Sequence, residues 1–150
     1  MPRFELSVTG VTAATGAAIA TINTTAGVPI RIREFGLFNT TGVATSFLLG
    51  KPANTPVAST TTASTLSLHA AGSAESTAAA LVGTAWSTAP TAPTATNSGR
   101  AITLPANIGA GIIWTWYDNP LELLVSSWLV VWNWGAGTTA ANRVYFVWDE

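Results

Sequence analysis

The chain has no cysteine and a single histidine, and these two scarcities exclude several kinds of chemistry. Without cysteine there is no disulfide, no thiolate metal site and no cysteine nucleophile. A Ser-His-Asp triad would have to use His69, and the sequence contains no Gly-x-Ser-x-Gly elbow to supply its serine. Because Leu66, Leu68 and Ala70 surround His69, we expect this histidine to be an ordinary strand residue.

Charge is also scarce, since only 9% of the residues are charged and the formal net charge is −1. The six basic residues are scattered, so no basic patch points to nucleic acid or to an anionic membrane as a partner. The mean hydropathy is nevertheless positive, at +0.37. A protein with so few charges tends to associate, and we infer that neighbouring molecules cover part of its surface.

Long apolar runs are missing as well. The best candidate, residues 123–132, contains Ser126 and Ser127 and is shorter than the ~18 residues of a membrane helix. The first five residues include Arg3 and Glu5, where a secretory leader would need an apolar run. We therefore expect neither a leader nor a membrane-spanning helix.

The carboxylates give no catalytic pattern. A glycosidase needs two of them facing each other, and a pair made by folding, such as Glu34 with Glu122, stays open at this point. Asp118-Asn119-Pro120 contains two oxygen ligands for calcium but is typical of a turn. Phosphate-binding loops, dinucleotide fingerprints and His/Cys clusters are absent from the sequence. We predict a protein that is not an enzyme and holds neither a cofactor nor a metal.

Aromatic residues are what the chain does have, and they are concentrated near its end. Six of its seven tryptophans lie between Trp114 and Trp148. Such rings either stack on sugars or fill a core or subunit contact. Because Trp128, Trp132 and Trp134 share one face of a strand with apolar flanks, burial or subunit contact is the favoured interpretation. That strand is apolar on both faces, which predicts a central position.

Hydrophobic alternation predicts short strands along most of the chain. In residues 28–39 the apolar phase changes from Ile30 and Ile32 to Phe35 and Leu37, which requires one extra residue, so we expect a bulge near Glu34 or Gly36. The expected strands are 4–9, 17–23, 28–39, 43–49, 66–68, 81–86, 112–116, 121–125, 128–134 and 143–148.

This pattern predicts an all-β fold with about eight to ten short strands. An antiparallel β-sandwich, jelly-roll-like, is the preferred architecture, with a small barrel as the alternative. No stretch has the i, i+3, i+4 apolar stripe of a helix. We expect one domain over residues 1–150, with a flexible loop rich in Pro, Thr and Ala at about 87–99.

Four stretches carry a family resemblance: residues 4–15 (FELSVTGVTAAT), 28–37 (VPIRIREFGL), 111–116 (GIIWTW) and 144–150 (VYFVWDE). Their pattern of strands and turns resembles small β-sandwich virion proteins of tailed bacteriophages, among them head decoration and minor capsid proteins. The resemblance implies a protein without enzymatic activity that is present in many copies on or in a capsid.

The resemblance also implies partners and a location. We expect a decoration (cement) or minor capsid protein on the exterior of the phage capsid, in contact with the major capsid protein and with copies of itself, for instance as a trimer. Candidate residues for these contacts are Phe4, Trp86, Trp116, Tyr117 and Trp134. The alternative is a carbohydrate-binding sandwich module, such as a fibre tip, that uses exposed tryptophans.

Overall fold

A computed structural model of the chain describes residues 2–13, 16–24, 27–63, 77–135 and 140–150, which form strands joined by turns and loops. Within these ranges no helix is long and apolar enough to cross a membrane. The strands are β1 (Arg3–Ala13), β2 (Ala17–Thr24), β3 (Ile30–Asn39), β4 (Thr45–Gly50), β5 (Val57–Ala63), β6 (Ala80–Thr88), β7 (Ser98–Leu104), β8 (Gly111–Thr115), β9 (Leu121–Leu123), β10 (Trp128–Asn133) and β11 (Ala140–Asp149).

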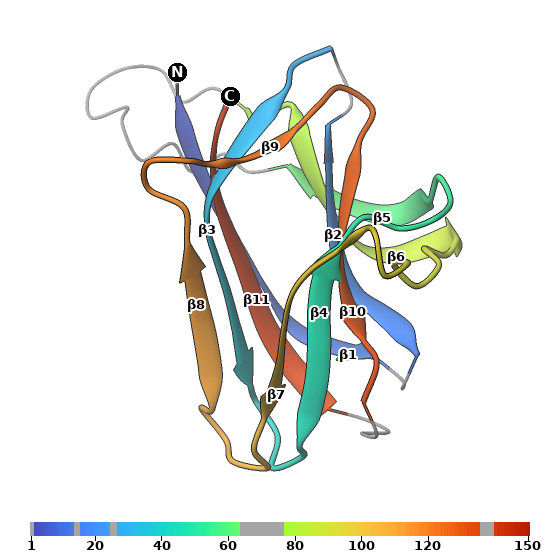
Figure 1. Cartoon of the computed structure of the whole chain (residues 1–150), viewed down its shortest axis with the longest axis vertical. Coiled ribbons are helices and arrows are strands. Elements are labelled where there is room, and N and C mark those ends of the chain that lie inside the picture. Colours follow the sequence, from blue (N-terminus) through green and yellow to red (C-terminus); the bar gives the residue numbers. More distant parts are fainter. Residues whose placement is uncertain (1, 14–15, 25–26, 64–76, 136–139) are drawn as a thin grey trace.

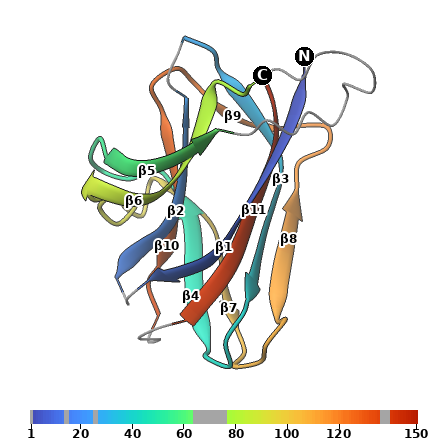
Figure 2. The ribbon, with the colours of Figure 1, turned by 180° about the vertical axis from the view of Figure 1, so that it is seen from behind.

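The strands form two antiparallel sheets that pack face to face, as Figures 1 and 2 show from opposite sides. The five-stranded sheet has the order β1-β11-β3-β8, and β9 also pairs with β3. The six-stranded sheet has the order β5-β6-β2-β10-β4-β7. The beginning of β1 and the end of β11 are neighbours, because Arg3 is paired with Asp149.

The strand order is that of a jelly roll. When the β5–β6 hairpin is set aside and β8 and β9 are taken as one interrupted strand, the remaining strands pair first with last, as β1·β11, β2·β10, β3·β8 and β4·β7. Such pairing describes one long antiparallel ribbon wrapped into two sheets. The prediction of an all-β, jelly-roll-like sandwich is confirmed, and the β5–β6 hairpin is an insertion that extends the second sheet beside β2.

The predicted bulge lies in β3 at Arg33, next to Glu34. Glu34 is paired with Val147 and Ile32 with Trp148, so β3 has one residue more than β11 at this point. The extra residue restores the inward direction of the apolar side chains: Ile32 before the bulge and Phe35 after it are both fully buried. It also divides β3 into a part that pairs with β9 and a part that pairs with β8.

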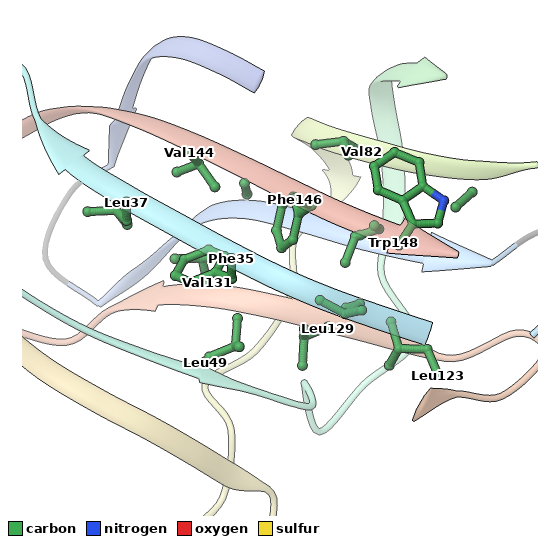
Figure 3. Packing of buried hydrophobic residues seen from close by; sticks show 14 of the residues in the cluster. Phe35, Leu37, Leu49, Val82, Leu123, Leu129, Val131, Val144, Phe146 and Trp148 are labelled. Atoms are coloured by element: carbon green, nitrogen blue, oxygen red, sulfur yellow. The ribbon is translucent and has the colours of Figure 1, made fainter. Parts of the chain in front are cut away.

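The main core lies between the two sheets. Figure 3 shows side chains of β3 and β11 facing those of β4 and β10. Phe35 contacts Phe146 at 5.4 Å between ring centroids and Trp114 at 5.6 Å, in the tilted and stacked arrangements that aromatic pairs favour. Leu129 and Val131 supply the contribution of β10.

A second, smaller core lies on the other face of β10. Ala18, Leu48, Val130 and Trp132 are each at most 9% exposed and form a cluster of their own. Trp86, on the inserted hairpin, packs against this cluster. The prediction of a central strand with apolar side chains on both faces is confirmed for β10, which lies between β2 and β4. The predicted range 128–134 was one residue too long, because β10 ends at Asn133 and Trp134 is 60% exposed.

The sequence patterns missed two strands, β5 and β7. Both consist mainly of Ser, Thr, Ala and Gly, and most of their residues are exposed, so neither shows an apolar alternation. β9 ends at Leu123, two residues before the predicted end. The strand expected at 66–68 and His69 lie outside the described residues.

The segment predicted as a loop at about 87–99 contains the connection between β6 and β7, residues 89–97, and its first two and last two residues belong to the two strands. It is hydrogen-bonded to the chain after β4: Asn97 O accepts from the Lys51 amide at 2.9 Å, and Ala89 O accepts from Asn54 Nδ2 at 2.9 Å. Pro93 lies against Gly50, where a Cβ atom would be 2.9 Å from the proline ring. These contacts place the segment against the end of β4.

Candidate partner-contact surfaces

The five predicted contact residues do not form one surface. Tyr117 is 74% exposed and Trp134 is 60% exposed, whereas the other three pack within the chain. Tyr117 follows the end of β8 and Trp134 follows the end of β10, and these two strand ends lie at opposite ends of the sandwich (Figure 1). Each exposed ring therefore belongs to a different part of the surface.

Phe4 is a core residue, which corrects its assignment as a contact residue. It is 1% exposed, and its ring stacks on Trp148 with a centroid distance of 6.0 Å. The cause is strand alternation: the charged neighbours Arg3 and Glu5 are partly exposed, so the residue between them faces the core. Phe4 contributes to the stability of the fold and is not accessible to a partner.

Trp86 is half-buried and serves mainly as a cover for the second core. Its Nε1 donates a hydrogen bond to Thr21 Oγ1 at 3.2 Å, which satisfies the polar end of the indole. The ring packs against the cluster that contains Val130 and Trp132. Only the remaining exposed part of the ring is available to a partner.

Trp116 lies at the open edge of the sandwich, where β7 and β9 border a cleft of about 310 Å³. The guanidinium carbon of Arg100 is 4.8 Å from the centroid of the Trp116 ring and 6.0 Å from that of Trp114. A cation at this distance is attracted by the electron-rich face of an indole. Arg100 therefore occupies the face that Trp116 would offer to a partner.

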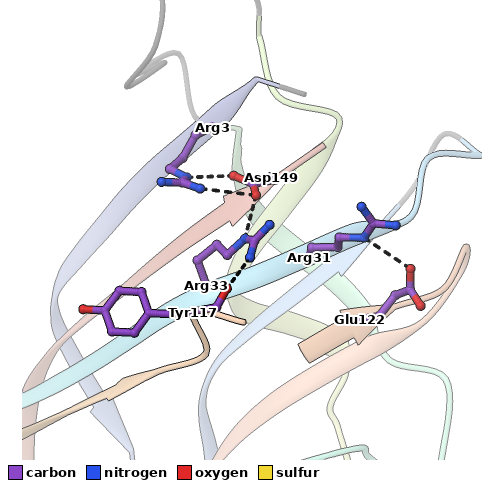
Figure 4. A network of polar contacts seen from close by, with 6 residues as sticks. All are labelled: Arg3, Arg31, Arg33, Tyr117, Glu122 and Asp149. Atoms are coloured by element: carbon purple, nitrogen blue, oxygen red, sulfur yellow. Dashed lines mark hydrogen bonds and ion pairs between the residues drawn. The ribbon is translucent and has the colours of Figure 1, made fainter. Parts of the chain in front are cut away.

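Tyr117 is exposed, but its backbone is held by an ion-pair network (Figure 4). Arg33 Nη1 donates to Tyr117 O at 2.7 Å, and Arg33 Nε donates to Asp149 Oδ2 at 2.6 Å. Arg3 Nε donates to the other oxygen of Asp149 at 2.7 Å. The network positions an exposed aromatic ring on a fixed backbone, which lowers the entropy cost of a contact.

The electrostatics of this network follow from its geometry. Burial by itself raises the pKa of Asp149, but the hydrogen bonds and charges of Arg3 and Arg33 outweigh it, so the pKa lies below its ordinary value. Hydrogen bonding to Asp149 raises the pKa of Arg3. A carboxylate that is held ionised between two guanidinium groups is a structural ion pair and is poorly suited to proton transfer.

Sequence reasoning missed most of the exposed apolar side chains. They lie in loops or on the outward face of an edge strand, where the sequence has no periodic apolar pattern. A single aliphatic residue in such a position cannot be told from an ordinary surface residue by sequence alone. They are Val57, Ile108, Ile113, Leu124 and Val125, with exposed fractions between 46% and 76%.

The structure describes the surroundings of the carboxylates that were considered for metal or acid–base chemistry. No group of three or more His, Asp or Glu side chains in these ranges could bind a metal ion. Glu34 accepts a hydrogen bond from Tyr145 Oη at 2.6 Å, and Glu122 pairs with Arg31 at 3.5 Å, so each member of the candidate glycosidase pair has another partner. Asp118 and Asn119 lie in a bend between β8 and β9, as expected for a turn.

No protein-family model, curated protein or solved structure matches this chain.

Proposed function

We propose that the chain is a non-enzymatic structural protein of a bacteriophage particle, a capsid decoration or minor capsid protein on the exterior of the shell. Copies of the chain would contact one another and the major capsid protein. The added contact area across neighbouring capsid subunits would stabilise the shell against internal pressure.

One observation carries the proposal: apolar side chains are exposed at both ends of a sandwich that has few charges. At one end of the sandwich, Tyr117 follows β8, and Leu124 and Val125 follow β9. At the other end, Trp134 follows β10. Aromatic residues such as Tyr117 and Trp134 are enriched in protein–protein interfaces, and these exposed side chains are the contact residues of the proposal. Their presence at two ends suits a subunit that contacts two neighbours at once.

The alternative, a carbohydrate-binding module that uses exposed tryptophans, has less support. Of the seven tryptophans, all within the described ranges, only Trp134 is exposed. Trp116 is faced by Arg100, and Trp86 packs on the second core. A sugar platform built from tryptophan would therefore have one open ring.

The test of the proposal is mass spectrometry of purified particles of the phage that encodes the chain. We expect the chain in many copies per particle, and we expect particles that lack it to lose their DNA at a lower temperature. Particles without the chain, or particles whose stability does not depend on it, would contradict the proposal.

The contact surface is tested with the purified chain. Sedimentation should give a mass that is a multiple of 15.5 kDa, and the Trp134→Asp variant should shift the mass towards the monomer. Ala95→Asp adds the same charge to an exposed loop residue and is the matched control. A monomer at all concentrations would count against self-contact.

A further inference from the structure

The outward face of the five-stranded sheet carries two aromatic rings that lie against the sheet. Phe38 of β3 and Tyr145 of β11 are both half-buried, and their ring centroids are 6.4 Å apart with an angle of 13° between the planes. We call this pair the ring platform. Two nearly parallel rings on neighbouring strands present a continuous aromatic surface to the outside.

Glycines on the neighbouring strands make the flat arrangement possible. The Tyr145 ring lies over Gly36 of β3, and the Phe38 ring lies over Gly111 of β8. A Cβ atom at either glycine would collide with the ring above it. The absence of a side chain at these two strand positions therefore creates the space that the rings occupy.

The Tyr145 ring is also anchored at its polar end. Its hydroxyl group donates a hydrogen bond of 2.6 Å to Glu34 Oε1. Burial and this hydrogen bond raise the pKa of Tyr145, so the phenol stays protonated at ordinary pH. A ring that is fixed both by packing and by a hydrogen bond loses little entropy when a ligand stacks on it.

The ring platform borders a hollow of about 620 Å³, and most of the other side chains that line it are polar. This volume is within the range of small-molecule sites. Glu5 and Ser7 line it from β1 and Arg143 from β11, while Thr40 lies in the loop after β3. Ile108, which is 76% exposed, lines the hollow from the β7–β8 connection.

The chemistry of these groups selects one class of ligand. A pyranose has an apolar C–H face, which packs on an aromatic ring, and an edge of hydroxyl groups, which both donate and accept hydrogen bonds. The hydroxyl groups of Ser7 and Thr40 and the opposite charges of Glu5 and Arg143 supply both kinds of partner. Single-stranded nucleic acid would require a basic groove, and a hollow lined by one arginine and one carboxylate does not provide it.

We propose that the hollow beside Phe38 and Tyr145 is a saccharide-binding site in which a sugar ring of a neutral oligosaccharide stacks on the ring platform. The site uses no tryptophan, and the proposal does not rest on the role of the chain in a phage particle. Mass spectrometry of particles and the sugar experiment below therefore succeed or fail independently.

The experiment is saturation-transfer NMR of the whole chain with a panel of soluble neutral oligosaccharides, namely maltohexaose, cellohexaose, mannohexaose and chitohexaose. Irradiation of aromatic protons should transfer saturation to the C–H protons of at least one member. Tyr145→Ala and Phe38→Ala should each weaken its binding about tenfold, which is the loss expected when one stacked ring is removed. Trp134→Ala is the matched control and should bind like the unchanged chain.

Two further variants keep the test independent of folding defects. Arg143 is exposed, so Arg143→Ala should keep the fold and still weaken binding several-fold. Tyr145→Phe retains the ring and should retain most of the binding. The proposal is overturned if no member of the panel binds at about 10 mM. It is equally overturned if binding depends on Trp134 and is unaffected by Phe38→Ala, or if this face mediates self-association and sugars do not compete with it.

Discussion

Arg33 Nε and Asp149 Oδ2 are 2.6 Å apart, and this ion pair joins β3 to β11 at the bulge. Arg33 is the residue that the bulge leaves without a partner in the β11 register. Its side chain instead binds a carboxylate that is only 7% exposed and that also binds Arg3. The bulge thus aims a guanidinium group at the end of the neighbouring strand, which illustrates how bulges redirect side chains.

Asp149→Asn should destabilise the fold at neutral pH. The amide cannot replace a charged acceptor between two guanidinium groups, so we expect the free energy of unfolding to fall by about 2 kcal/mol. The folded pKa of Asp149 is below its ordinary value of 3.8, so the stabilisation is complete above that value and is lost as the pH falls through the folded pKa. Urea unfolding of both proteins between pH 7 and pH 2 measures this difference.

Glu122→Gln is the matched control for this experiment. The Arg31–Glu122 pair is 3.5 Å apart, and its side chains are 44% and 50% exposed, so it should contribute less than about 0.5 kcal/mol. If the gap between Asp149→Asn and the unchanged chain stayed constant down to pH 2, the network would not act through the charge of Asp149.

Glu150→Gln should loosen the start of β6. The Glu150 carboxylate accepts hydrogen bonds from the amides of Ala79 and Ala80, both at 2.8 Å, and from Trp148 Nε1 at 3.0 Å. The side-chain amide of glutamine would replace one of the two accepting oxygens with an NH2 group, which would face an N–H donor. We therefore expect a loss of about 1–3 kcal/mol in the free energy of unfolding. Hydrogen exchange of the Ala79 and Ala80 amides should become faster.

The control for this prediction is exchange elsewhere in the molecule. The backbone N–H of Asn39 donates a hydrogen bond to the backbone oxygen of Ala110 at 2.7 Å, so this bond does not involve a side chain. Its exchange should change only as far as global stability changes. Equal acceleration at Asn39 and Ala80 would mean that Glu150 has no local effect on β6.

Much of the fold could be predicted from the sequence, because a strand with one buried face has apolar residues at every second position. The phase change from Ile32 to Phe35 predicted a bulge near Glu34 or Gly36, and the bulge lies at Arg33, one residue from the first of these positions. A bulge is required there because both side chains face the core, and a regular strand would turn one of them outward. Likewise, the two apolar faces of residues 128–134 predicted a central strand. β5 and β7 could not be found in this way, because strands held by backbone hydrogen bonds with exposed side chains carry no such period.

The surface was less predictable for a related reason. Whether an aromatic residue is open or covered depends on a partner that is distant in sequence: Arg100 faces Trp116, and Trp148 packs on Phe4. The ring platform depends on glycines in adjacent strands, and only the strand register places Gly36 beside Tyr145. Composition identified the aromatic residues, but tertiary pairing decides which of them reach the surface.

The second core can be tested with adjacent residues of β10. Val130 faces the cluster covered by Trp86 and Val131 faces the main core, and both are fully buried. We expect Val130→Ala and Val131→Ala to cost similar amounts, about 2 kcal/mol each in urea unfolding, because both remove apolar atoms from packed surroundings. Val125→Ala, at a side chain that is 46% exposed, is the control and should cost much less. A near-neutral Val130→Ala would mean that this face of β10 is open to water.

The contact between Arg100 and Trp116 should be measurable as a coupling free energy. Their separation of 4.8 Å at a partly exposed site predicts about 0.5–1 kcal/mol in a double-mutant cycle with Arg100→Met and Trp116→Leu. Arg100→Met should also make the tryptophan fluorescence easier to quench with acrylamide, since the guanidinium group no longer shields the indole face. Lys51 lines the same cleft but makes no cation–π contact with Trp116 in the part of the chain that the structure describes, so Lys51→Met in the same cycle should show no coupling to Trp116. Equal coupling for both cations would show that the cleft responds to net charge rather than to the stacked geometry.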